Sequence, residues 1–221
     1  MSKAGEAQVI ELSRARGPAA RRGKARRIIA IGGGKGGIGK SLLSANLGIA
    51  LAKRGAKVVL ADLDLGGANL HTCLGVPQPK GSLSDFIERR ADSLDQLLAP
   101  TPHENLRLLS GALDGLDAAN PRHQQKSKLL RNLRNLDVDF VVLDLGAGTA
   151  FNVLDFFLVA DTGVVVMLPE PTSIENAYRF IKSAFFRRLQ ALAPDDDFPK
   201  LVGQGLVPRE GQLARTPWDM V

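Results

Sequence analysis

A glycine-rich stretch with two lysines, GGGKGGIGKS at residues 32–41, holds the residues best suited to chemistry. Its last eight residues fit the pattern G-x-x-x-x-G-K-[ST], in which successive backbone N–H groups surround a phosphate. In such a loop Lys40 reaches the β- and γ-phosphates of a nucleotide, and the Ser41 hydroxyl binds Mg²⁺. The structural alternative is a glycine-rich turn that only ends a strand. The predicted nucleotide-binding residues are Gly34, Lys35, Gly36, Gly37, Ile38, Gly39, Lys40, Ser41 and Leu42.

Lys35 lies inside this loop but is not needed to complete the phosphate pattern. Its backbone already lines the phosphate cradle, so its ammonium group cannot easily contact phosphates that its own loop holds. The side chain can, however, project across an open face of the protein. The alternative is a solvated loop lysine, since lysine is common in exposed loops.

Three aspartates follow buried-type strands. Asp62 and Asp64 are one residue apart near the end of KVVLADLDL, so both side chains point to the same face. Asp144 ends the apolar run of FVVLD and is placed to approach the water shell of a bound Mg²⁺. Gly148 lies in the following loop, where a glycine lets the backbone approach a γ-phosphate. For Asp62 and Asp64, a plain role as turn residues is the alternative.

Apolar runs and helical patterns alternate along the chain, and this alternation must position these residues. Continuous Val/Ile/Leu strands separated by helices predict an α/β fold, with a doubly wound, mostly parallel sheet and helices on both faces. Ligands of such sheets bind at the carboxyl ends of the strands, where the glycine loop and the aspartates lie. The expected strands are 28–31, 57–65, 105–111, 139–148 and 162–170. The expected helices are 40–57, 82–99 with a break, 124–136 and 173–193.

Length and charge divide the chain into three parts. A length of 221 residues favours one domain or at most two. Residues 1–27 hold eight basic and two acidic side chains, which equals the whole formal charge of +6. We therefore expect a basic, disordered tail at 1–27, a nucleotide-binding domain at 28–193 and an irregular segment at 194–221. The single cysteine and the lack of a long apolar run favour a cytoplasmic protein.

The segment KGGIGKS at 35–41 resembles the deviant Walker A motif of the MinD/ParA family of P-loop ATPases. The form D-L-G-A-G at 144–148, together with LPEPTSIENAY at 168–178, is more similar to the flagellar-number regulators FlhG/FleN within that family. The resemblance runs from about residue 28 to 190. It implies that Lys35 crosses a dimer interface to the partner's ATP. It also implies that Asp64 positions the attacking water, while Asp62 and Asp144 arrange the magnesium.

The resemblance predicts a dimerising switch that hydrolyses Mg-ATP slowly to control the location or number of a cellular structure. The expected partners are a second copy of the chain and an unidentified protein. The basic tail could contact DNA or acidic lipid at a nucleoid or membrane, or could simply be solvated. No stable membrane helix is evident, since Pro217 and Asp219 interrupt the end of the chain. An adenine-holding element is not recognisable after Pro194, which raises the hypothesis of a C-terminal truncation.

Two other functions are weighed against this prediction. A non-hydrolysing, nucleotide-dependent binding module would use the same loop without catalysis. A metabolic P-loop enzyme, such as a small-molecule kinase, is disfavoured because Lys35 has no role in it. The three histidines are scattered, and His71 with Cys73 supplies only two of the ligands that a zinc site needs.

Overall fold

Six strands form one sheet in the order β3-β4-β2-β5-β1-β6. The computed structural model describes residues 27–64, 67, 69–111 and 123–192. Every neighbouring pair is parallel except β3 and β4, which run antiparallel. The strands are β1 (Arg27–Gly32), β2 (Val58–Leu63), β3 (Leu98–Pro100), β4 (Leu106–Leu109), β5 (Phe140–Leu145) and β6 (Thr162–Val165).

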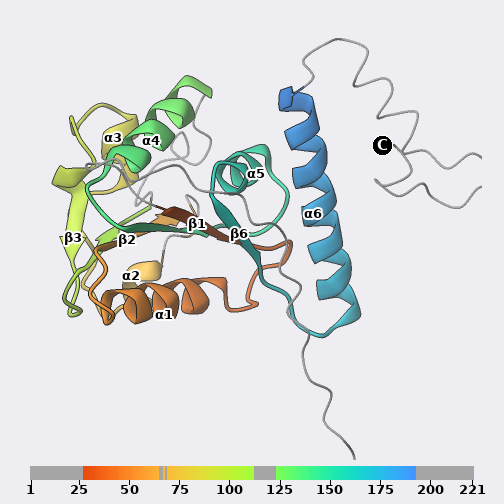
Figure 1. Cartoon of the computed structure of the whole chain (residues 1–221), viewed down its shortest axis with the longest axis horizontal. Coiled ribbons are helices and arrows are strands. Elements are labelled where there is room, and N and C mark those ends of the chain that lie inside the picture. Colours follow the sequence, from red (N-terminus) through yellow and green to blue (C-terminus); the bar gives the residue numbers. More distant parts are fainter. Residues whose placement is uncertain (1–26, 65–66, 68, 112–122, 193–221) are drawn as a thin grey trace, which may run out of the picture.

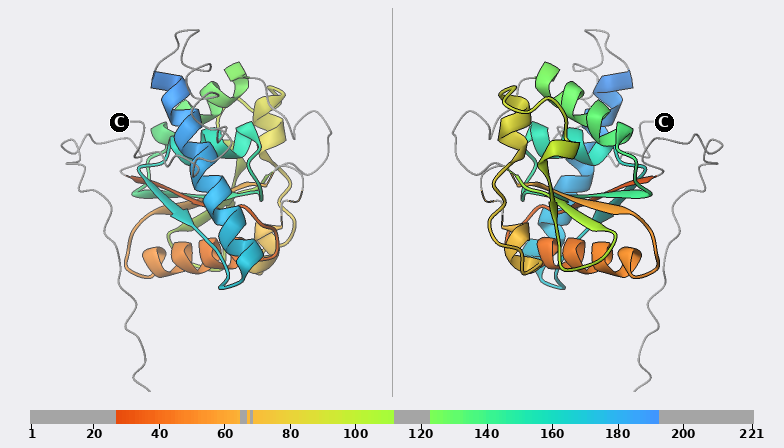
Figure 2. Two further views of the ribbon diagram at one scale, coloured as in Figure 1. Left: turned by 90° about the vertical axis from the view of Figure 1, so that its right-hand side faces the viewer. Right: turned by 90° about the vertical axis from the view of Figure 1, so that its left-hand side faces the viewer.

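Helices cover both faces of this sheet (Figure 1). The first two helices pack on one face, and the next three lie over the other; the last stands beside α5 and β6, as the side views of Figure 2 also show. The helices are α1 (Lys40–Ala52), α2 (Leu70–Cys73), α3 (Leu83–Ile87), α4 (His123–Asn135), α5 (Phe151–Leu158) and α6 (Pro171–Leu192), with a 3₁₀ turn η1 at Asp95–Leu97. This arrangement confirms the predicted doubly wound, mostly parallel fold.

The central strands are apolar on both sides because each side faces a separate core. Along β2, Val58 and Leu60 pack toward α1 and α2, whereas Val59 and Ala61 pack toward α3, α4 and α5. Alternate residues of a strand point to opposite faces, so a strand buried on both faces needs an unbroken apolar run. This run stops where the strands reach the carboxyl edge, and polar residues take over there.

The register of the sheet brings the predicted aspartates together. β2 and β5 pair directly, and Asp62 stands opposite Asp144. On the other side of β5, β1 pairs so that Ile31 stands opposite Asp144. The glycine loop that follows β1 therefore begins next to the aspartates, as the rule for parallel strand ends predicted.

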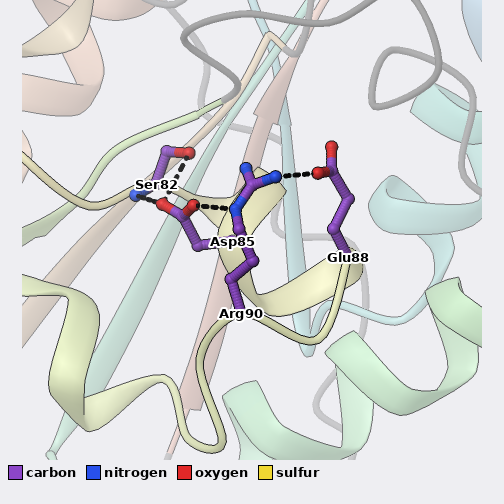
Figure 3. A network of polar contacts seen from close by, with 4 residues as sticks. All are labelled: Ser82, Asp85, Glu88 and Arg90. Atoms are coloured by element: carbon purple, nitrogen blue, oxygen red, sulfur yellow. Dashed lines mark hydrogen bonds and ion pairs between the residues drawn. The ribbon is translucent and has the colours of Figure 1, made fainter.

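The helix predicted at 82–99 is wrong in most of its length. Only α3 forms, and Arg89 then adopts a left-handed backbone with φ of 64°. Figure 3 shows how this turn is closed: the Asp85 carboxylate accepts hydrogen bonds from the Ser82 N–H at 2.8 Å and from the Arg90 Nε at 2.7 Å. Arg90 also pairs with Glu88. After this hydrogen-bonded turn, the chain forms η1 and then β3, an antiparallel edge strand.

Two further differences concern the second half of the chain. The helix α5 was not predicted from the sequence. Two of its eight residues, Leu154 and Phe156, are buried. The strand predicted at 162–170 ends at Val165, and α6 starts at Pro171, slightly before the predicted start. Residues 1–26 of the predicted basic tail and residues 193–221 lie outside the described residues, whereas Arg27 begins β1 and is not part of a disordered tail.

The long helix α6 packs against α5 and the edge of the sheet at β6. Ala177, Phe180 and Ala184 are buried, and the Phe180 ring meets Phe157 of α5 edge-on with centroids 4.9 Å apart. A neighbouring stripe of the same helix, including Tyr178 and Ile181, stays more than half exposed. Within the described part of the chain, none of the helices has the length and apolar character needed to cross a membrane.

Candidate functional site

The loop between β1 and α1 has the backbone shape that a phosphate cradle requires. Gly37 and Gly39 have φ of 71° and 91°, a left-handed conformation that side chains with a Cβ rarely adopt. Gly39 is the N-cap of α1, and the first turn of that helix holds no acidic side chain. The positive end of the helix dipole faces the loop, and no acidic side chain of the first turn itself neutralises it, which favours an anion there.

Two other glycines of the loop are required by close packing instead of by φ. A Cβ added at Gly33 would lie 2.7 Å from the Val166 carbonyl oxygen. A Cβ added at Gly34 would lie only 2.2 Å from the carbonyl oxygen of Asn176 in α6. Gly34, the first glycine of the phosphate motif, thus allows α6 to pack closely against the loop. The position of α6 therefore depends on the phosphate loop.

Lys40 is directed into the cradle. Only 8% of the residue is exposed, and its Nζ donates a hydrogen bond to the carbonyl oxygen of Lys35 at 3.1 Å. Burial lowers the pKa of Lys40, while the nearby charges of Asp144 and Asp64 act in the opposite direction. A buried ammonium group that is only partly compensated by carboxylates gains from a further anion, and a nucleotide phosphate supplies one.

Asp144 lies at the end of β5, under the first turn of α1. It is 2% exposed, and its Oδ1 is 2.9 Å from the hydroxyl of Ser44, which donates to it. Burial raises the pKa of Asp144; hydrogen bonds from Ser41 and Ser44 and the charge of Lys40 limit that rise. The predicted partners Lys40, Ser41 and Asp144 are therefore in mutual reach in the folded chain.

Asp62 and Asp64 have different surroundings, although they come from the same strand end. The two carboxylate oxygens of Asp62 accept backbone hydrogen bonds from Asp64 at 3.1 Å and from Leu70 at 2.9 Å. Asp62 thus holds both ends of the 64–70 loop. Burial raises the pKa of Asp62 to about 7. The hydrogen bond from Leu70 lowers this pKa, and the charge of Asp144 raises it further. Its predicted contribution to the magnesium shell remains a prediction.

The side chain of Asp64 is exposed and faces the loop after β5. A Cβ added at Gly146 would lie 3.1 Å from the Asp64 Oδ1, so the glycine leaves room for this carboxylate. Farther along, Gly148 has φ of 93°, and its N–H donates to the Gly33 carbonyl oxygen at 3.2 Å. This bond joins the loop after β5 to the phosphate loop, and the approach of Gly148 to a γ-phosphate remains a prediction.

The ammonium groups of Lys35 and Lys40 have different partners. Its Nζ lies 3.2 Å from the Glu170 Oε2, in the segment between β6 and α6, and the two side chains are 39% and 52% exposed. The structure therefore gives this lysine a solvent-facing position and an acidic neighbour in its own chain. Of the other predicted loop residues, Ile38 is buried and Leu42 is 62% exposed.

Two residues of the site were not predicted. Ser44 follows Ser41 by three residues, which places both hydroxyls on one face of α1, and this spacing could have revealed it. Glu170 could be found only by knowing that β6 lies next to β1. The chemistry of the set, a hydroxyl and hard carboxylates beside a phosphate cradle, fits Mg²⁺, which binds few protein oxygens and keeps phosphate and water ligands. Within the described residues, no group of three or more His, Cys, Asp and Glu side chains forms a metal cluster.

Comparisons with known proteins identify relatives of the chain over most of its described residues. The family model described as ParA, NUBPL iron-transfer P-loop NTPase, matches residues 24–192. The chain is 37% identical over 157 residues to the antiactivator FleN of Pseudomonas aeruginosa, a match that covers 70% of this chain and 55% of that protein. It is 34% identical over 165 residues to the flagellum site-determining protein YlxH of Helicobacter pylori, covering 71% and 53%.

A solved structure gives the same result for the fold. The septum site-determining protein MinD of Pyrococcus horikoshii, complexed with Mg-ADP, superposes with a TM-score of 0.63 at 31% identity, covering 71% of this chain and 63% of that one. The chain spans about half the length of the two flagellar relatives. By its matched residues, its sheet and its phosphate loop, the chain belongs to the ParA/MinD family of P-loop NTPases.

Proposed function

We propose that this chain is an ATP-dependent dimerising switch that hydrolyses Mg-ATP slowly. Lys40 would hold the β- and γ-phosphates, and the Ser41 hydroxyl would bind Mg²⁺ with Asp144 in its water shell. The buried, partly compensated ammonium group of Lys40 supports the first role. The shared reach of Ser41 and Asp144 supports the second. Bound Mg²⁺ would neutralise part of the phosphate charge.

The position of Lys35 carries the proposal of a dimer. Its ammonium group leaves the cradle formed by its own loop and lies half-exposed beside Glu170. A second copy facing this surface could receive Lys35 at its own bound triphosphate. ATP brings more negative charge to this face than ADP does, so the exchange of Lys35 from Glu170 to a partner's phosphate favours a dimer only when ATP is bound.

We expect hydrolysis to be slow because, among the residues that the structure describes, no strong general base is placed to activate the attacking water. Asp64 is exposed and adjacent to the cradle, so it would orient the water instead of being buried as a strong base. Catalysis would then come from positioning and from neutralising the charge of the transferred phosphoryl group. Turnover of this kind suits a timer that resets the dimer.

The cargo of such a switch is proposed from the relatives. FleN is an antiactivator, YlxH determines a flagellum site and MinD determines a septum site. We propose that this protein likewise controls the location or number of a cellular structure through a partner protein. A non-hydrolysing binding module is the second candidate, and phosphate release separates the two.

The test is the substitution Lys35→Ala in the full chain. We expect ATP affinity to stay within about threefold, because Lys40 and the backbone hold the phosphates. ATP-dependent dimerisation, measured by sedimentation, should weaken by about 30-fold or more, since truncating one partner of a desolvated charge pair costs about 2 kcal/mol or more. Phosphate release should fall to background.

Lys53→Ala is the matched control, because Lys53 is an exposed lysine at the opposite end of α1. It should leave dimerisation and phosphate release unchanged. Wild-type dimerisation with equal strength in ATP and ADP would refute the switch. ATP-dependent dimerisation without phosphate release would support the non-hydrolysing module instead.

A further inference from the structure

Ser44 is a buried hydroxyl next to the magnesium-side carboxylate, one turn after Ser41 in α1. The residue is 0% exposed. Its Oγ lies 2.9 Å from the Asp144 Oδ1 and 3.0 Å from the carbonyl oxygen of Lys40. The phosphate motif ends at Ser41 and gives Ser44 no role.

The hydroxyl of Ser44 has one proton for these two acceptors. A backbone carbonyl and an ionised carboxylate both accept hydrogen bonds only, so the proton is donated to one of them at a time. A bond to a charged carboxylate is shorter and about twice as strong as a neutral one. Ser44 therefore donates its proton to Asp144 whenever that carboxylate is ionised, and the positive charge of Lys40 favours the ionised form.

Packing alone gives no reason for a serine at this position. The neighbouring buried residues of α1 are Ala45, Gly48 and Ala52, which pack against the apolar side of the sheet. Alanine is the better helix former and buries no polar group, so it would suit the same space. The hydroxyl is explained by the carboxylate beside it.

The orientation of Asp144 also needs support because a second carboxylate lies opposite. Asp62 and Asp144 are direct partners across β2 and β5, and both are 2% exposed. Two buried carboxylates side by side repel each other when both are ionised. The hydrogen bond from Ser44 ties the Asp144 carboxylate to α1.

We infer that Ser44 is a positioning residue, which orients the Asp144 carboxylate toward the water shell of Mg²⁺; this inference rests on the proposed function. Ser44 acts through Asp144 and does not contact the metal or the nucleotide. Groups that orient metal-binding side chains typically change metal affinity by about 10- to 100-fold when they are removed. The predicted effect therefore falls on magnesium and leaves the affinity for the nucleotide itself in place.

The experiment measures binding of a fluorescent ADP analogue while MgCl₂ is titrated against EDTA. Bound Mg²⁺ should slow the release of the ADP analogue, and the Mg²⁺ concentration at half of this effect measures the affinity for the metal. In Ser44→Ala this concentration should rise about tenfold. Nucleotide affinity in EDTA should change by less than about twofold, because the phosphate contacts of Lys40 and the loop remain. A defect in overall packing would weaken both quantities together.

Two variants make the result specific to the hydroxyl. Ser44→Cys keeps an atom at the position of the hydroxyl oxygen but makes it a weak donor, so it should shift the Mg²⁺ requirement in the same direction as Ser44→Ala. Ser84→Ala removes another buried serine hydroxyl, which has no hydrogen-bond partner within the described structure, and should change nothing. A Cys variant that behaves like wild type would overturn the inference, because a lost volume would then explain the alanine result.

The wild-type titration separates this inference from the function on which it rests. If Mg²⁺ has no effect on nucleotide binding in the wild type, the proposed function fails, and the role of Ser44 fails with it. If Mg²⁺ tightens wild-type binding and Ser44→Ala has the same half-saturation, only the role of Ser44 is overturned.

Discussion

The two lysines of the phosphate loop have opposite surroundings, although both lie at the same edge of the sheet. Lys40 is 8% exposed and lies near the buried Asp144 and the exposed Asp64, with a pKa lowered by burial. The side chain of Lys35 is 39% exposed and pairs with Glu170, itself half-exposed. The inner group of Lys40, Asp62 and Asp144 is held by strands and by α1. The outer pair joins two connections between elements.

This difference separates binding from switching. Charges inside a protein interact strongly and are costly to separate from their partners, so the inner group has one arrangement. An exposed ion pair is worth about 0–1 kcal/mol, so Lys35 can leave Glu170 at little cost. A site that must hold phosphate firmly and also change partners needs both kinds of charge, and the loop supplies one lysine of each kind.

The largest effect is expected where the phosphate loop packs closely against α6. Gly34→Ala would place a Cβ 2.2 Å from the Asn176 carbonyl oxygen, a backbone atom that cannot rotate away. We expect the free energy of unfolding to fall by about 3 kcal/mol, at the upper end for overpacking, and nucleotide binding to be lost. Urea unfolding of the nucleotide-free protein measures the first quantity.

Gly36→Ala in the same loop is the control for this prediction. Its added Cβ would meet only the Ala147 Cβ, at 4.0 Å. The unfolding free energy should therefore change by less than about 0.5 kcal/mol. Equal losses for the two variants would show that the loop resists any side chain and that α6 is not the cause.

A smaller effect should appear as pH dependence of the inner group. The pKa of Asp62 is raised by burial to about 7, so the folded chain binds this proton more tightly than the unfolded chain. Its contribution to stability is then present at low pH and is lost as pH rises from about 4 to about 7. We expect the nucleotide-free protein to lose about 2 kcal/mol between about pH 5 and pH 8.

Asp62→Asn should reduce this pH dependence in urea unfolding, because an amide does not titrate, while the raised pKa of Asp144 still contributes in the same direction. Asp137→Asn, whose side chain is 83% exposed in the native chain, should keep it. A wild-type stability that increases from pH 5 to pH 8 would contradict the assignment and would mean that Asp62 is ionised without cost.

The inner group was predictable from the sequence and the outer pair was not. Asp62 and Asp144 each follow a continuous apolar run, and parallel strands bring their carboxyl ends to one edge whatever the order of the strands. Glu170 follows a strand as well, but its pairing with Lys35 depends on β6 lying next to β1. Strand order is a property of the whole sheet, and no local pattern states it.

The missed elements have local causes. The eight residues of α5 are mostly apolar, so no polar face reveals a helical period. The segment at 82–99 carries helical signals, but the left-handed Arg89 and the Asp85–Arg90 contact stop the helix after Ile87. The three residues of β3 form a strand only because β4 is there to pair with them.

The smallest change in stability is expected from Glu170→Gln, which removes the partner of Lys35 but keeps the shape of the side chain. The unfolding free energy should change by less than about 0.5 kcal/mol, because both side chains are solvated. ATP-dependent dimerisation should nevertheless strengthen by up to about fivefold, since Lys35 no longer has to leave a carboxylate before it reaches the second copy.

Glu175→Gln removes a similarly exposed pair with Arg179 on α6 and should leave dimerisation unchanged. We thus expect Glu170→Gln and Glu175→Gln to change stability by the same small amount but to differ in their effect on dimerisation. Weaker association in Glu170→Gln would mean that Glu170 supports the dimer directly. The Lys35–Glu170 ion pair would then persist in the dimer. Unchanged association in both variants would mean that the ion pair has no part in the switch, and the contrast between the two lysines would reduce to a difference in burial.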